Sequence, residues 1–91
     1  MYLEIVTPEA ILYSGEVTSV TVPGVMGEFQ MLENHAPIIS LLSAGNIKIQ
    51  GNALIEKEVA DKFSQENGAT VLPINSGTLE MKDNKIIVLA D

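Results

Sequence analysis

The fold class is decided by residues 16–22, which read Glu16-Val17-Thr18-Ser19-Val20-Thr21-Val22. Side chains alternate between the two faces of an extended chain, so Thr18, Val20 and Val22 fall on one face. Alternation over this length predicts a β-strand. The chain as a whole has 18 isoleucines and valines and five threonines among its 91 residues. Such β-branched residues favour strands.

Similar segments lie on the C-terminal side of this strand. Residues 27–32 alternate, and residues 47–50 do so strictly. Residues 38–42 are almost continuously apolar, which predicts a strand covered on both faces. Between the first two strands, Pro23-Gly24 is typical of the central positions of a type II turn.

The end of the chain contains two further predicted strands, residues 78–82 and 85–89. Asp83 and Asn84 separate them, and both residue types tolerate the positive φ of a tight two-residue hairpin. Short strands with turn signals every 8–12 residues are typical of a sandwich or barrel. We therefore predict an all-β, antiparallel β-sandwich that forms a single domain over residues 1–91.

One segment departs from the strand pattern. In residues 52–67, Ile55, Val59 and Phe63 recur at a spacing of four, with Asn52 as a possible cap and Gly68 just beyond the end. This spacing predicts an inserted helix around residues 53–66, whose apolar side chains pack on the sandwich or bind a partner. A long β-hairpin is the alternative for the same residues.

Composition excludes several classes of function. The chain has no cysteine and one histidine, which excludes disulfides, thiolate zinc sites and multi-histidine metal sites. A net charge of −7 argues against nucleic acid or anionic lipid as the main partner. The start of the chain shows no secretory signal or transit peptide, and no apolar run is long enough to span a membrane.

Three possible sites have simpler interpretations. Gly24 and Gly27 lie three apart, but neither the helix nor the nearby lysine of a phosphate-binding loop follows them. His35 has no serine motif beside it, so bracing of the turn before Pro37 is favoured over catalysis. Lys82, within Met81-Lys82, is weakly similar to the modified lysine of lipoyl and biotinyl carrier domains, although no pseudo-repeat surrounds it.

Several stretches, taken in order, resemble the epsilon subunit family of F-type ATP synthases, and together they cover residues 1–50 and 74–91. The most specific part is Gly27-Glu28 followed seven residues later by His35-Ala36-Pro37. The other matching stretches are Leu3-Glu4-Ile5-Val6-Thr7-Pro8-Glu9, Tyr13-Ser14-Gly15, Val20-Thr21-Val22-Pro23-Gly24, Ile38-Ile39-Ser40-Leu41-Leu42, Gly45-Asn46-Ile47-Lys48-Ile49, Ser76-Gly77-Thr78-Leu79-Glu80-Met81 and Ile86-Ile87-Val88-Leu89-Ala90-Asp91.

The resemblance implies a non-catalytic subunit of the central stalk, which binds the gamma subunit, rests on the membrane c-ring and couples ion flow to ATP synthesis. It implies no metal or cofactor, and a peripheral position on the cytoplasmic face of the cell membrane. Gly27, Glu28, Asn34 and His35 are expected to contact the c-ring, with their two turns side by side at one end of the sandwich. The alternatives are a carrier domain modified at Lys82 and a free-standing binding module.

The sequence departs from the family pattern in three places. Residues 51–69 are longer than the usual hairpin, and Asn75-Ser76-Gly77 replaces a common Ser-Gly-Gly. Many members continue past the equivalent of Asp91 into a two-helix hairpin, whereas this sequence stops there. The expectation is a form without that hairpin, which does not inhibit ATP hydrolysis by the route that the hairpin provides.

Overall fold

The computed structural model describes residues 1–51 and 53–91, and most of these lie in β-strands. The ten strands in this part of the chain are β1 (Tyr2–Val6), β2 (Ile11–Glu16), β3 (Ser19–Gly24), β4 (Gly27–Leu32), β5 (Ile38–Leu42), β6 (Gly45–Gln50), β7 (Ser64–Glu66), β8 (Ala69–Ile74), β9 (Gly77–Lys82) and β10 (Lys85–Ala90). One short 3₁₀ helix, η1 (Lys57–Lys62), precedes β7. The predicted all-β class is confirmed.

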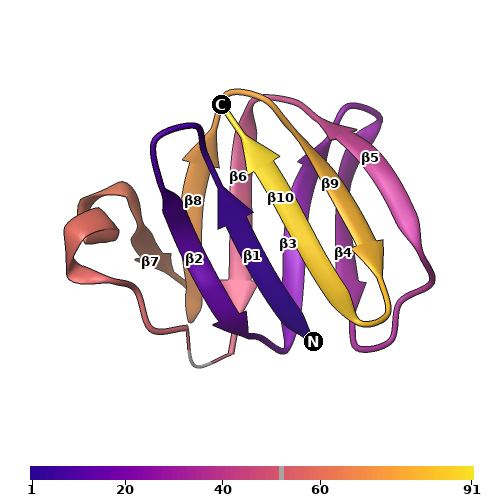
Figure 1. Ribbon diagram of the computed structural model, residues 1–91, viewed down its shortest axis with the longest axis horizontal. Helices are drawn as coiled ribbons and strands as arrows, with labels where there is room; N and C mark the ends of the chain where they lie inside the picture. The colour runs from indigo at the N-terminus through magenta and orange to yellow at the C-terminus, as the bar shows by residue number, and fades with distance from the viewer. Residues whose placement is uncertain (52) are drawn as a thin grey trace.

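The strands form two layers that face each other (Figure 1). The front layer has the order β2-β1-β10-β9-β5, and the rear layer has the order β4-β3-β6-β8-β7. The layers are continuous at one corner, where Gly24 of β3 pairs with Leu42 of β5. β1 and β10 pair in parallel, while the other described pairs are antiparallel, so the sandwich is mixed rather than purely antiparallel.

The core lies between the layers and follows the alternation of the strands. In the front layer, Leu3, Ile86 and Met81 are direct cross-strand neighbours, and each is at most 1% exposed. In the rear layer, Val20 and Ile49 are also neighbours and are fully buried. Packing of these two inner faces supplies most of the buried apolar surface of the domain.

Of the two turns predicted at Pro23-Gly24 and Asp83-Asn84, only the second is confirmed. Asp83 (φ 53°) and Asn84 (φ 61°) join β9 and β10 as the tight turn that their residue types predict. The Pro23-Gly24 turn is wrong, because both residues lie inside β3 and the turn falls at Val25 and Met26. A Cβ on Gly24 would lie 2.8 Å from the Phe29 ring, so glycine here serves packing rather than the turn.

The strand predicted at residues 38–42 exists as β5, but it is not covered on both faces. Ile39 is 79% exposed and Leu41 is 61% exposed, while Leu42 is buried. β5 lies at the edge of the front layer, and nothing in the described residues covers its outer side. The continuous apolar run therefore indicates a strand that faces the core on one side and solvent on the other.

The predicted helix around residues 53–66 is wrong. Only the six residues of η1 are helical in the described part of the segment, and the chain is extended at Glu56 before it and at Phe63 after it. β7 and β8 then form a hairpin whose turn residues, Asn67 (φ 51°) and Gly68 (φ 82°), both have positive φ. The long hairpin that was the alternative for residues 52–67 is also wrong, because residues 57–62 form η1 and only β7 of the β7–β8 hairpin lies in that segment. The proposed cap at Asn52 lies outside the described residues.

Ile55, Val59 and Phe63 nevertheless pack on the sandwich. Val59 in η1 is buried in the core cluster, and Ile55 and Phe63 are partly buried against it. We expect Phe63→Ala to lower the free energy of unfolding by about 1–2 kcal/mol, less than a fully buried phenylalanine would contribute. Urea unfolding measures this. Leu54→Ala is the control, because Leu54 is 86% exposed; equal effects of the two substitutions would contradict the packing of Phe63.

Candidate protein interface

The outer face of the front layer is ordered into three rows by the strand register. The apolar row, the mixed row and the basic row run across the strands in that order, from the end of the sheet near Asp91 to the end near Asn84. The apolar row contains Val6, Leu89, Thr78 and Leu41; the mixed row contains Glu4, Ile87, Glu80 and Ile39; the basic row contains Tyr2, Lys85 and Lys82.

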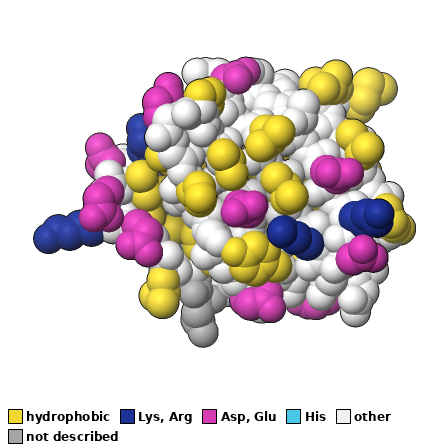
Figure 2. All heavy atoms as spheres, in the orientation of Figure 1, with side chains coloured by type: hydrophobic (Ala, Val, Ile, Leu, Met, Phe, Trp, Pro, Cys, Tyr) yellow, Lys and Arg dark blue, Asp and Glu magenta, His cyan; other side chains and the backbone are white. Residues whose placement is uncertain are grey.

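Large apolar side chains on this face are open to solvent. Ile39, Leu41 and Leu89 are each more than half exposed. Figure 2 shows hydrophobic side chains spread over this face, with acidic and basic side chains between and beside them. The apolar row also borders a shallow groove of about 590 Å³, lined among others by Val6, Val25 and Ala90. An exposed apolar patch with a polar rim is typical of a protein interface.

The outer face of the rear layer is more polar. Thr21 of β3 lies between Gln30 of β4 and Lys48 of β6 in the strand register. Lys48 also approaches Glu28 across the sheet, with 3.6 Å between the ammonium nitrogen and a carboxylate oxygen. This difference between the layers makes the front face the stronger candidate for an apolar contact.

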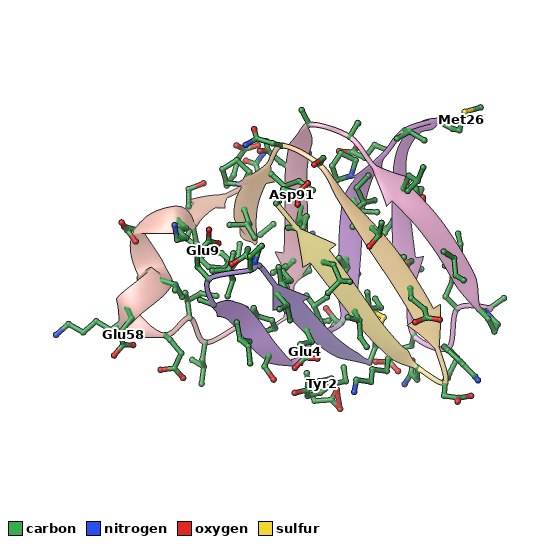
Figure 3. The ribbon with its side chains drawn as sticks, turned by 45° about the horizontal axis from the view of Figure 1, so that its top comes forward. Tyr2, Glu4, Glu9, Met26, Glu58 and Asp91 are labelled. Carbon is green, nitrogen blue, oxygen red and sulfur yellow. The ribbon has the colours of Figure 1, made fainter. Side chains whose placement is uncertain are left out.

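The first pair of residues predicted to bind a partner, Gly27 and Glu28, lies at the tip of the β3–β4 hairpin. Gly27 has a φ of 126°, which favours glycine. Val25 and Met26 form the turn itself, and Met26 is 97% exposed. Figure 3 shows Met26 pointing away from the body of the domain.

The second pair, Asn34 and His35, lies at the opposite end of β4. The Asn34 backbone N–H donates a hydrogen bond of 2.8 Å to the Asn84 side-chain oxygen in the β9–β10 turn. The exposed His35 ring has its Nδ1 2.8 Å from the Ala36 carbonyl oxygen. The six-residue strand β4 begins with the first pair and ends two residues before Asn34, and its length corresponds to about 20 Å. The prediction that the two turns lie side by side is therefore wrong.

Glu33 helps to order the Asn34 end. Its carboxylate contacts the Met1 amino group and accepts a 3.0 Å hydrogen bond from the Asn84 amide nitrogen. These two hydrogen bonds, the first being the stronger cause, hold the pKa of Glu33 below its usual value. The loop after β4, the β9–β10 turn and the start of β1 are therefore joined at this end.

The sequence alone does not predict the outer face as a binding surface, and it does not single out Ile39, Leu41 or Lys85 as contact residues. The apolar run at residues 38–42 predicts a strand covered on both faces, although an apolar run at a sheet edge also fits an interface. Among residues 1–51 and 53–91, no three potential acidic or histidine metal ligands are grouped together. Within the same residues, no helix has the length and apolar character needed to cross a bilayer.

Comparison with known proteins gives a consistent match. The family model described as "ATP synthase, Delta/Epsilon chain, beta-sandwich domain" matches residues 1–91. The ATP synthase epsilon chain of Campylobacter concisus is 40% identical over 91 residues, which is all of this chain and 60% of the relative. That of Sulfurimonas denitrificans is 45% identical over 89 residues, 98% of this chain and 58% of the relative. The chain thus spans about 60% of the length of these relatives.

A solved structure has the same fold at much lower sequence identity. A chain in the central stalk and c-ring structure of the Tetrahymena thermophila mitochondrial ATP synthase aligns with a TM-score of 0.74 and 14% identity. The alignment covers 99% of this chain and 62% of the other. At this identity the likeness establishes the architecture, with its two packed layers.

Proposed function

We propose that this chain, which belongs to the family of the ATP synthase delta/epsilon-chain β-sandwich domain, is a non-catalytic subunit of the rotor of an F-type ATP synthase. In this role it joins the gamma subunit to the membrane c-ring, so that ion flow is coupled to ATP synthesis. The observation that carries the proposal is the family match over the whole of residues 1–91. That match supports the rotor role over a carrier domain modified at Lys82 and over a free-standing binding module.

The structure suits a part that transmits force. A continuous hydrogen-bonded network links the strands, and twelve large side chains from both layers are fully or nearly fully buried in one core. They are Leu3, Ile5, Val20, Val22, Met31, Ile47, Ile49, Leu72, Leu79, Met81, Ile86 and Val88. Closely packed interiors deform little under load. The proposed role needs stiffness and binding surfaces, and it needs no nucleophile or cofactor.

We assign the outer face of the front layer to the gamma subunit, because it carries the exposed apolar side chains Ile39, Leu41 and Leu89. The tip of the β3–β4 hairpin, with Gly27 and Glu28, is assigned to the c-ring. We do not assign Asn34 and His35 to the c-ring, because they lie about 20 Å away, beyond the other end of β4. The protein is then peripheral, held at the cytoplasmic face of the cell membrane by its partners.

Cysteine cross-linking in assembled complexes tests this orientation. We expect Glu28→Cys to form cross-links to c-ring loops, whereas His35→Cys does not, because the two residues lie about 20 Å apart at opposite ends of β4. The matched control is Glu58→Cys, since Glu58 is exposed on η1 at the far side of the domain (Figure 3). If only His35→Cys formed cross-links to the ring, the proposed orientation would be wrong, and the Asn34 end of the sandwich would face the ring.

The role itself is tested by purification from native membranes. A tagged form of the protein is expected to recover the gamma and c subunits together. Recovery of neither subunit would overturn the rotor proposal.

Intact mass after co-expression with lipoate or biotin ligase tests the carrier alternative, because a modified Lys82 would favour it.

A further inference from the structure

The basic row contains an arrangement that the fold alone does not explain. Lys82 and Lys85 are direct cross-strand partners that flank the β9–β10 turn, and both are exposed on the outer face. Side chains in such positions have Cβ atoms about 5 Å apart, and like charges there are destabilising. The chain has five basic and twelve acidic residues, and yet two of its lysines face each other.

The surroundings of the two lysines leave them available to a partner. In residues 1–51 and 53–91, the ion pairs within 4.0 Å involve Lys48 and the Met1 amino group, and neither Lys82 nor Lys85. The nearby acidic side chains, Glu80 and Asp83, share a shallow hollow with the lysines without reaching that distance. The nitrogen of Lys85 lies 5.6 Å from the centroid of the Tyr2 ring, a cation–π contact that positions this ammonium group.

The mixed row, one step away on the same face, has the opposite charge. Glu4 and Glu80 lie on either side of Ile87 in the register. Successive outward residues on a strand are about 6.7 Å apart. A partner surface that fits all three rows therefore presents apolar groups first, then a basic group, and then an acidic group about 7 Å farther along the strands.

We propose that the partner places a carboxylate against Lys82 and Lys85, so that this pair fixes the register in which the front face binds. The proposal rests on the proposed function, in which that partner is the gamma subunit. Apolar contact alone tolerates sliding along the sheet, because it has little directionality. A displacement by one row along β9 and β10 would bring the partner's carboxylate to Glu80 and Ile87, and the like charge of Glu80 would repel it.

Charge substitutions test the proposal in a binding assay with purified gamma. Lys82→Gln with Lys85→Gln is expected to weaken binding by about tenfold, and the corresponding double Glu variant by more, because repulsion replaces attraction. Binding by the wild type should also weaken with added salt more steeply than binding by the Gln variant. Thermal unfolding of each variant, compared with the wild type, separates loss of binding from loss of folding.

The matched control changes the same number of charges away from the face. Lys57→Glu with Lys62→Glu alters both ends of η1, where both lysines are exposed. We expect this variant to retain the wild-type affinity for gamma. Equal losses in the control and the test variants, or none in the folded test variants, would overturn the lysine proposal and leave the rotor role intact. Failure of the wild-type protein to bind gamma would overturn both.

Discussion

Replacing Ile86 with alanine is expected to lower the free energy of unfolding by about 3–4 kcal/mol. Ile86 is fully buried on β10, between Leu3 of β1 and Met81 of β9. Neighbours on both sides and the facing layer limit how far the structure can collapse around the missing atoms, so a cavity remains. Because domains of this size are only marginally stable, the variant is expected to unfold at markedly lower urea concentration.

The neighbouring residue provides a matched control. Ile87 points to the outer face of the same strand and is only half-buried, so Ile87→Ala is expected to cost about 1 kcal/mol or less. Equilibrium urea unfolding of the two variants, with the slope of the transition checked for change, measures the difference. A loss from Ile87→Ala as large as that from Ile86→Ala would contradict the assignment of inner and outer faces.

Alternation was the strongest guide to the fold, since it depends on a local rule and a half-buried strand obeys it directly. The inward positions of β4, for example, are Phe29 and Met31, as the pattern predicts. The family resemblance also identified the sandwich. Alternation does not reveal strand order, however, and the parallel pairing of β1 with β10 arises from contacts between the two ends of the chain.

The prediction of a helix around residues 53–66 is wrong for a specific reason. Ile55, Val59 and Phe63 are spaced as on a helix, but they contact the core from three local structures: the loop before η1, η1 itself and the residue after η1. Asn67-Gly68 is a strong signal for a two-residue hairpin. Because Gly68 is interpreted as the residue just beyond a helix, the β7–β8 hairpin at the end of the segment is not predicted.

The candidate site was less predictable than the fold. Glu28 and His35 are close in sequence, but β4 runs between them, so they lie at opposite ends of the rear layer. The pairing of Lys82 with Lys85 follows directly from the predicted two-residue turn. The sequence does not show which strands lie on either side of that hairpin, because their positions depend on long-range pairing. The outer face could therefore be identified only from the structure.

Gly77→Ala is expected to have the second large effect, a loss of about 2–3 kcal/mol in the free energy of unfolding. Gly77 begins β9 and pairs with Ala90 on one side and Leu42 on the other. A Cβ at this position would lie 2.6 Å from the Leu89 carbonyl oxygen and 3.3 Å from the Ala90 Cα. These are backbone atoms of the neighbouring strand, so accommodation requires β9 and β10 to move apart.

Gly15→Ala is the control, because its added Cβ would also make a close contact, 2.9 Å from the Tyr13 hydroxyl oxygen. That oxygen is at the end of a side chain, and a small ring movement relieves the contact. We therefore expect a loss of about 1 kcal/mol or less for Gly15→Ala, measured by the same urea titration. Similar losses of unfolding free energy for the two variants would contradict this, because they would mean that separating β9 from β10 costs no more than moving a side chain. A larger loss at Gly77 would show that its close contact with backbone atoms, unlike the contact of Gly15 with a side chain, cannot be relieved locally.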